Sequence, residues 1–170
     1  MKKKLSYLLI VILILSMFPM SAFAADPAEE AVTSISVGDV PTALDFDNST
    51  NTLWVVNSND SSVSVIDLST RKVIDTLSVG SNPHDIAIGS KYAYVICKDQ
   101  DYVYVYDLET REEAGAIQVQ RYTNKLYLAP DGTLYVLYLG ENAGWVTEID
   151  TTTNSVSKKH SILENSTFMM

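Results

Sequence analysis

The sequence is short of features that several classes of protein require. Cys97 is the one cysteine in 170 residues, which excludes an internal disulfide. Only 7 glycines and 5 prolines are present, too few for a collagen-like or low-complexity chain. Basic residues number 12 against 21 acidic ones, a net charge of −9. Nucleic acids and anionic membrane surfaces attract clustered Lys and Arg, so neither is expected as a partner.

Residues 1–24 have the pattern of a secretory signal peptide. Residues 2–4 are lysines, residues 8–15 form an apolar run, and residues 22–24 read Ala-Phe-Ala, a small-residue cleavage signal. The apolar run is short for a bilayer span of about 20 residues, although an uncleaved anchor is the alternative. We expect a secreted, periplasmic or cell-surface protein without membrane insertion after cleavage. Cleavage leaves nine basic against 21 acidic side chains, a charge of −12.

Most of the remaining chain is a threefold repeat. Copies begin at Ser36, Ser78 and Gln118, so they recur every 40 to 42 residues. Each copy holds four short runs rich in β-branched and aromatic residues, separated by turn residues such as Asn, Asp and Ser. In the first copy the predicted strands are residues 41–47, 51–57, 62–68 and 72–79.

Four strands in a repeat of about 40 to 45 residues are typical of a β-propeller blade. Runs such as Trp54-Val-Val and Tyr94-Val-Ile do not alternate cleanly, so each sheet carries apolar groups on both faces and needs a neighbour on each side. We predict an all-β partial propeller of about three four-stranded antiparallel blades, with no helix beyond the leader. A segment at 25–35 precedes the predicted blades, which are residues 36–77, 78–117 and 118–160, and a fourth blade starts at 161–170.

The repeats resemble those of the YVTN-type repeat β-propeller family. The tetrapeptide positions read Trp54-Val-Val-Asn57, Tyr94-Val-Ile-Cys97 and Tyr135-Val-Leu-Tyr138, and Ser-Val-Gly-x-x-Pro opens the first two copies. The third copy departs from the family, with Gln120-Arg-Tyr-Thr123 in place of Gly-x-x-Pro. The resemblance covers residues 36–160. It implies a fold of usually about seven blades and an extracytoplasmic or surface-associated protein.

Three blades are too few to close a ring, which takes about four to eight. One interpretation is that the chain is a piece of a longer propeller. The other is that a second copy of the chain completes the ring as a homo-oligomer. An end blade without a neighbour is expected to expose an apolar face.

In propellers, the loops that lead into the inner strands and the loops that join the two middle strands form the usual binding surface. The candidate ligand-binding residues in these loops are Thr42, Asp60, Asn82, His84, Asp99, Asp101, Arg121 and Asn124. His84 is a candidate metal ligand or general base. Its counterparts in the other copies are Thr42 and Asn124, so no second histidine supports a metal site. An exposed polar loop residue is the favoured interpretation of His84.

Three aspartates recur at one register, and a threonine follows each of them three residues later. The pairs are Asp67 with Thr70, Asp107 with Thr110, and Asp150 with Thr153. Repeated metal ligands are one interpretation. A structural role is favoured, because a carboxylate and a hydroxyl at a turn can bind loose backbone N–H groups.

Tyr102, Tyr104 and Tyr106 share one face of a predicted strand. They form either an aromatic platform for a sugar or peptide or, as we favour, packing between blades. Cys97 is expected to be a buried, inert thiol.

The sequence shows no motif of a known catalytic machinery. It has no Cys-x-x-Cys-His, no Gly-x-Ser-x-Gly, no phosphate-binding glycine loop and no zinc-ligand spacing. We expect an exported, non-catalytic binding or interaction module without cofactor or metal, whose partner is a protein or a cell-envelope polymer. The alternatives are a fragment of a propeller enzyme, either a lactonase-like hydrolase or a quinone- or haem-dependent oxidoreductase, and a fragment without a function of its own.

Overall fold

The computed structural model describes residues 34–98, 100–140 and 144–162. The predicted signal peptide, nearly all of the segment 25–35, and residues 163–170 of the predicted fourth blade lie outside the described residues. So does Asp99, one of the candidate binding residues. Within the described ranges the chain contains strands and turns only, and no helix there is long and apolar enough to span a membrane.

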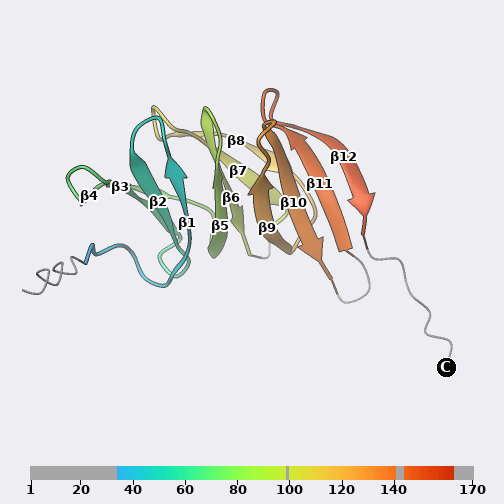
Figure 1. Ribbon diagram of the computed structural model, residues 1–170. Coiled ribbons are helices and arrows are strands. Elements are labelled where there is room, and N and C mark those ends of the chain that lie inside the picture. The colour runs from blue at the N-terminus through green and yellow to red at the C-terminus, as the bar shows by residue number, and fades with distance from the viewer. Residues whose placement is uncertain (1–33, 99, 141–143, 163–170) are drawn as a thin grey trace, which may run out of the picture. The chain divides into compact units, whose positions relative to one another are not determined.

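Twelve strands occur in three groups of four (Figure 1). Blade 1 contains β1 (Pro41–Asp47), β2 (Thr52–Asn57), β3 (Ser62–Asp67) and β4 (Lys72–Ser78). Blade 2 contains β5 (Pro83–Ile88), β6 (Tyr92–Cys97), β7 (Tyr102–Asp107) and β8 (Glu113–Gln118). Blade 3 contains β9 (Thr123–Leu128), β10 (Thr133–Leu139), β11 (Gly144–Asp150) and β12 (Ser155–Ser161).

Each blade is a four-stranded antiparallel sheet in which neighbours in sequence are neighbours in space. The blades follow one another through their inner strands, since β1 packs against β5 and β5 against β9. The all-β partial propeller predicted from the repeats is thereby confirmed. The four strands predicted in the first copy agree with β1 to β4 to within one residue at every end.

Two apolar clusters fill the spaces between successive blades. We call the face that a blade turns toward the next blade its forward face, and the opposite face its rear face. At the first junction, Trp54, Val56 and Val65 on the forward face of blade 1 meet Val95 and Tyr106 on the rear face of blade 2. All five are almost completely buried. Burial of a valine or larger apolar side chain contributes about 1.5–3 kcal/mol, so these junctions supply most of the driving force for folding.

The second junction repeats the arrangement with different residues. Tyr94, Ile96 and Val103 on the forward face of blade 2 meet Leu134 and Ile149 of blade 3. Among the tyrosines of β7, Tyr106 is buried at the first junction and Tyr104 packs against the same cluster, while Tyr102 is exposed. The tyrosine stripe therefore serves mainly as packing between blades.

Two carboxylates, of the half-buried Asp45 and the buried Asp85, join the inner strands of successive blades. The carboxylate of Asp45 accepts a hydrogen bond of 2.7 Å from the backbone N–H of Ile88 in the next blade. Asp85 in blade 2 accepts one of 2.7 Å from the N–H of Leu126 in blade 3, and its other oxygen lies 3.2 Å from Lys125 Nζ. A hydrogen bond from an N–H to a charged carboxylate is stronger than one to a neutral acceptor. Each junction therefore has a strong hydrogen bond between its two blades at the inner edge.

The forward face of blade 3 is part apolar and part charged. A hollow of about 280 Å³ lies over Tyr127, Tyr135 and Leu137, and Tyr127 is 61% exposed. Strand pairing places His160 where Leu77 and Ile117 stand in the first two blades.

His160 Nε2 lies 2.9 Å from Glu148 Oε1 on the same sheet. The expectation of an apolar end face therefore holds for its inner part only, because His160, which contacts Glu148, replaces the outer leucine and isoleucine.

We predict that Cys97 does not react with thiol reagents in the folded protein. The side chain is fully buried, as the sequence indicates, and burial raises the pKa of the thiol to about 12, which keeps the reactive thiolate scarce. Mass spectrometry after incubation with iodoacetamide should show an unmodified chain in buffer and one adduct in urea. Rapid labelling without denaturant would contradict this packing.

Removal of the Asp85 carboxylate should loosen the junction between blades 2 and 3. Asp85→Ala leaves the buried Leu126 N–H without its acceptor, which should cost about 1–3 kcal/mol in the free energy of unfolding. Asp85→Asn keeps an acceptor oxygen and should cost less. Urea titration followed by tryptophan fluorescence measures both, with the exposed Glu112→Ala as a control expected to stay within about 0.5 kcal/mol of the unsubstituted chain. Equal effects of Asp85→Ala and Glu112→Ala would show that the hydrogen bond between Asp85 and the Leu126 N–H contributes little to stability.

Candidate functional site

The loops that were predicted to share one face do meet at one end of the blades. We call the end at which the inner strands begin the leading end. In blade 1 the N–H of Ser58, in the loop joining β2 and β3, donates to the carbonyl of Val40 just before β1 at 3.0 Å. In blade 2 the N–H of Lys98 donates to the carbonyl of Asn82 at 2.8 Å.

Each inner strand starts with a β-bulge, and the bulged residue is a predicted candidate. Pairing with the second strand skips Thr42, His84 and Asn124 in blades 1, 2 and 3. A bulge leaves one residue outside the ladder and turns its side chain, which is why bulges occur beside functional sites. The prediction that these three residues lie in loops is therefore wrong, because they lie within the inner strands.

A left-handed residue stands two positions before each bulge. Val40, Asn82 and Tyr122 have φ values of 52°, 56° and 62°. Asparagine tolerates this conformation, but a β-branched valine and a bulky tyrosine adopt it at a cost of about 1–3 kcal/mol. The three copies thus keep the same backbone at the leading end even where the residue does not favour it.

The junction of blades 1 and 2 is closed at the leading end by a chain of hydrogen bonds. The hydroxyls of Thr42 and Ser58 lie 3.0 Å apart. Ser58 Oγ in turn donates to the carbonyl of Pro83 in the next blade. Small side chains and a continuous set of hydrogen bonds leave no polar group unpaired here.

The junction of blades 2 and 3 is open at the corresponding place. By strand pairing, His84, Lys98 and Thr123 replace Thr42, Ser58 and Pro83. These three residues, with Tyr122 and Asn124, line a cavity of about 310 Å³, which we call the His84 cavity. His84 is half-buried, so the favoured interpretation of an exposed loop residue is also wrong in this respect.

Two polar atoms at the His84 cavity have no hydrogen-bond partner. They are Nδ1 of His84 and Oγ1 of Thr123, and both atoms are buried. Thr123 as a whole is only 4% exposed. The one other such side-chain atom in the described ranges is Asn57 Oδ1. Burial lowers the pKa of His84, against the opposing influence of the Thr123 backbone and the Asp85 charge, so its imidazole is neutral at pH 7.

Other predicted binding residues stabilise the loops of the leading end. Asp60 Oδ2 accepts a 2.6 Å hydrogen bond from the N–H of Asp39, and the carbonyl of Asp101 accepts one of 2.8 Å from Val119. The carbonyl of Asn82 accepts the Lys98 N–H described above. Arg121 lies over the ring of Tyr122, with 5.1 Å between its guanidinium carbon and the ring centroid. The described part of the chain contains no group of three or more His, Cys, Asp or Glu side chains that could hold a metal ion.

The recurrent aspartates lie at the opposite end, where each joins two strands. Asp67 accepts a 2.7 Å hydrogen bond from the N–H of Ser69, Asp107 one of 2.9 Å from Glu109, and Asp150 one of 2.8 Å from Thr152. The N–H groups of Thr70 and Thr110 also donate to the first two carboxylates. The Thr153 hydroxyl lies 2.8 Å from that of Ser155.

Sequence reasoning missed a fourth member of this set. Asp47 caps the turn between β1 and β2 and accepts a 2.8 Å bond from the N–H of Ser49. The spacing Asp-x-x-Thr at 47–50 is the signal that could have found it. Each of these four turns ends on a left-handed residue: Asn51, Arg71, Arg111 and Asn154.

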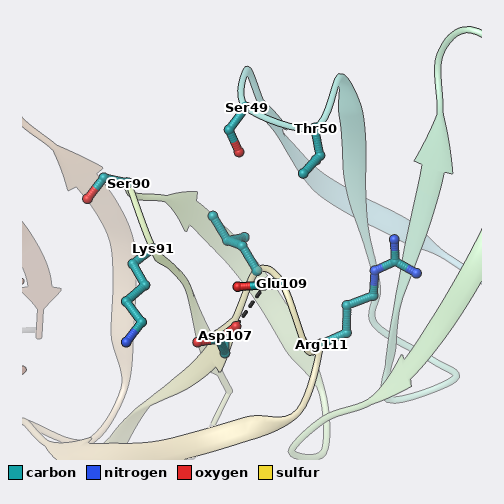
Figure 2. A pocket seen from close by; sticks show the side chains of 8 residues that line it. Ser49, Thr50, Ser90, Lys91, Asp107, Glu109 and Arg111 are labelled. Atoms are coloured by element: carbon teal, nitrogen blue, oxygen red, sulfur yellow. Dashed lines mark hydrogen bonds between the residues drawn. The ribbon is translucent and has the colours of Figure 1, made fainter.

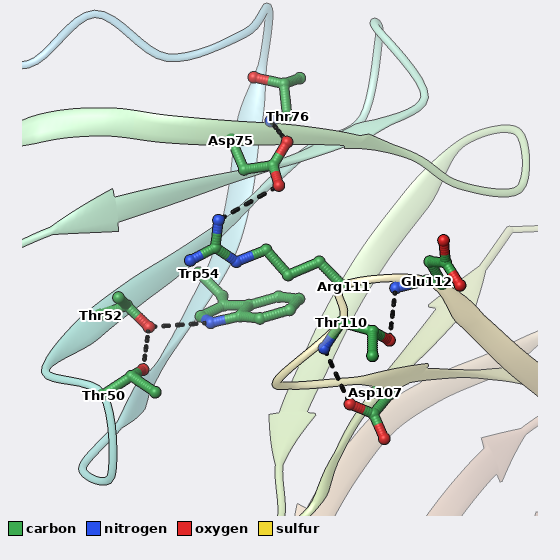
Figure 3. Close-up of polar contacts among 9 residues, drawn as sticks. All are labelled: Thr50, Thr52, Trp54, Asp75, Thr76, Asp107, Thr110, Arg111 and Glu112. Atoms are coloured by element: carbon green, nitrogen blue, oxygen red, sulfur yellow. Dashed lines mark hydrogen bonds and ion pairs between the residues drawn. The ribbon is translucent and has the colours of Figure 1, made fainter.

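The same end holds a cavity of about 390 Å³ between the turns of blades 1 and 2, which the sequence did not indicate (Figure 2). It is lined by hydroxyls and charged groups, among them Thr50, Lys91, Asp107 and Arg111. Two of its polar side chains, Thr50 and Arg111, already have partners. Thr50 donates to Asp47, and Arg111 forms a 3.3 Å ion pair with Asp75 of β4 (Figure 3). The leading end is therefore the better candidate for ligand binding.

These features define a partial β-propeller with a cavity between two of its blades. Models of protein families and curated protein sequences give no match. Solved structures do. A chain of Kuenenia stuttgartiensis hydrazine synthase is 27% identical, with a TM-score of 0.72 over 78% of this chain and 40% of its own.

Dihydro-heme d1 dehydrogenase NirN in complex with DHE (16% identity, TM-score 0.63) also covers 78% of this chain and 31% of its own. A 6-phosphogluconolactonase-like protein from Bacteroides fragilis (16%, TM-score 0.64) covers the same share, and 41% of its own. This chain spans less than half the length of each.

The turn aspartates should make the protein less stable in acid. Hydrogen bonds lower the pKa of Asp67 (chiefly from the Ser69 hydroxyl), of Asp107 (chiefly from the Thr110 N–H) and of Asp150 (chiefly from the Thr152 hydroxyl) below 3.8. A lowered folded-state pKa stabilises the fold above the unfolded value, and this contribution is lost as the pH falls through the folded value.

The urea midpoint, measured between roughly pH 6 and pH 2, should therefore fall steeply at the acid end. Substitution of all three aspartates by asparagine should flatten that decline. Glu112→Gln, a control that keeps all three turn carboxylates, should leave the decline unchanged. An equally steep fall in the triple variant would assign acid sensitivity to other groups.

Proposed function

We propose that this chain is an exported, non-catalytic binding module of the YVTN-repeat type that takes its ligand at the leading end of the blades. The observation that carries the proposal is the His84 cavity. The second junction is open where hydrogen-bonded small side chains close the first, and it leaves His84, Lys98 and Asn124 lining a space that a ligand can enter. Export rests on the signal-peptide pattern of residues 1–24.

The framework around the cavity supports binding because it is rigid. Bulges and left-handed residues recur at the start of all three inner strands, and in blades 1 and 2 the neighbouring loops are hydrogen-bonded to them. Side chains held by sheets lose little further freedom when a ligand arrives. A binding surface of this kind requires no movement of the blades.

The chemistry of the cavity favours binding over turnover. A general base needs a partner that orients it and a second group that supplies or removes a proton. Asp85, the residue next to His84, is committed to the N–H of Leu126 and to Lys125. Its carboxylate therefore serves the junction between the blades.

The alternative is a fragment of a propeller enzyme, and the names of the similar solved structures are the reason to test it. Hydrazine synthase and the dehydrogenase NirN are enzymes by name. If this chain were part of a hydrolase, His84 at the leading end would be its candidate base. A partner that is a protein or a cell-envelope polymer fits the binding module instead.

Binding can be tested by co-sedimentation of the purified chain with the insoluble cell-envelope polymer of the organism that encodes it. The unsubstituted chain should sediment with the polymer in a saturable way. The double variant His84→Ala/Lys98→Ala should bind at least about tenfold more weakly, the loss of roughly 1.4 kcal/mol or more. Lys91→Ala, at the opposite end, is the matched control and should bind normally.

Three outcomes would overturn the proposal. The chain could remain in the supernatant, or the double variant could bind as well as the unsubstituted chain. Lactone hydrolysis by the unsubstituted chain that is abolished in His84→Ala would establish the enzyme alternative.

A further inference from the structure

The forward face of blade 3 has an apolar hollow at its inner part. The hollow of about 280 Å³ is lined by side chains of three strands, among them Tyr127 of β9, Tyr135 and Leu137 of β10, and Val146 of β11. At the two junctions the matching area is covered, because β5 packs on β1 and β2, and β9 packs on β5 and β6. The strand that would cover the hollow is therefore an inner strand placed over β9 and β10.

At each junction the fourth residue of the incoming inner strand provides cover. These residues are Ile86 in β5 and Leu126 in β9, which are 5% and 6% exposed. Ile86 belongs to the cluster that contains Trp54, and Leu126 to the cluster that contains Tyr94. Tyr135 has the position of Trp54 and Tyr94 in blade 3, because each of the three pairs with the fifth residue of its inner strand. A further inner strand should therefore place its own fourth residue beside Tyr135.

The chain leaves the outer strand of blade 3 as it leaves those of blades 1 and 2. Val79, which follows β4, donates its N–H at 2.9 Å to a carbonyl just before the third strand of its blade, and Val119, which follows β8, does so at 2.8 Å. Ile162, which follows β12, donates its N–H to the carbonyl of Gly144, the first residue of β11, at 2.9 Å. At both earlier exits this hydrogen bond precedes a further inner strand.

The spacing of the strands assigns residues to the next inner strand. Four residues separate β4 from β5, and four separate β8 from β9. Because β12 ends at Ser161, the same spacing starts an inner strand at Ser166 and makes Met169 its fourth residue. Methionine suits this position, since its flexible side chain fills irregular apolar space and its sulfur packs favourably beside aromatic rings.

The outer part of the same face needs no apolar cover. Glu148 stands where Val65 and Val105 stand in blades 1 and 2, because all three pair with the aromatic residue at the centre of the face. His160, which contacts Glu148, replaces a leucine and an isoleucine farther out. A single strand over β9 and β10 therefore covers the apolar part of the face and leaves the polar part in water.

From these observations we propose that residues 166–170 lie against the forward face of blade 3 as an inner strand, with Met169 in the hollow beside Tyr127, Tyr135 and Leu137. The structure describes the chain as far as Ile162, and three residues, 163–165, join it to this strand. Such a short tether keeps the segment at a high effective concentration at the face, which favours it over a second copy of the chain. The contact is independent of the proposed ligand-binding function.

NMR of the full chain labelled at the methionine methyl groups tests the contact directly. The chain has five methionines, and Met169→Leu and Met170→Leu assign two of the five signals. The Met169 methyl should show nuclear Overhauser effects to the ring protons of Tyr127 and Tyr135. Met170 should show none, because successive side chains of a strand point to opposite sides.

Substitution of the same two methionines by aspartate gives a matched pair. Met169→Asp places a carboxylate on the apolar hollow and should lower the urea midpoint. Met170→Asp adds the same charge on the other side of the strand and should leave the midpoint unchanged. Removal of residues 163–170 should lower the midpoint about as far as Met169→Asp does.

Three results would overturn the proposal. They are a Met169 methyl without contact to either tyrosine, equal midpoints for the two aspartate variants, and a contact supplied by another chain. The third is detected by mixing chains labelled at methionine with chains labelled at tyrosine, because a nuclear Overhauser effect between the two labels is then intermolecular. Loss of the contact on dilution would likewise assign the face to a second copy.

Discussion

A sheet with apolar side chains on both faces is stable in water only when another sheet covers each face. Val95 and Ile96 are adjacent in β6, point to opposite sides of blade 2, and are both fully buried. One belongs to the cluster shared with blade 1 and the other to the cluster shared with blade 3. Both clusters contain residues of blade 2. The blades therefore depend on one another and are not independent units. The geometry of the leading end depends on this stacking, since its cavity lies between two blades and belongs to neither.

Repetition explains why so much of the fold could be predicted from sequence. Three copies of one pattern locate the strands better than any single stretch, because the Asp-x-x-Thr turns at 67, 107 and 150 mark the same boundary each time. The bulges were missed for a physical reason. A bulged residue such as His84 differs from a loop residue only by the pairing of its neighbours, and no side-chain pattern records that.

The candidate site was predictable in part. His84 could be singled out because it departs from Thr42 and Asn124 at the same register. The burial of His84 could not be predicted from the sequence, because it depends on how closely blade 3 approaches blade 2. Lys98 was not singled out at all. Its importance is visible only when it is compared with Ser58, which closes the first junction in three dimensions. Sequence reasoning compared single repeats. A comparison of the two junctions, each made of residues from two successive blades, was needed to find Lys98.

The inner-strand carboxylates have a consequence for the order of the blades. Asp45 and Asp85 each accept a hydrogen bond from the next blade, but they stand at positions two residues apart in the repeat. Blade 2 has Ala87 at the position of Asp45, and blade 1 has Ala43 at the position of Asp85. The corresponding positions of blade 3 hold Lys125 and Tyr127. The blades are therefore not interchangeable modules. In a chain in which blades 2 and 3 exchanged places, Ala43 would face the Leu126 N–H and Tyr127 would face the Ile88 N–H, so neither N–H would meet an aspartate. The linear arrangement of the repeats is thus encoded in the charges at their inner edges.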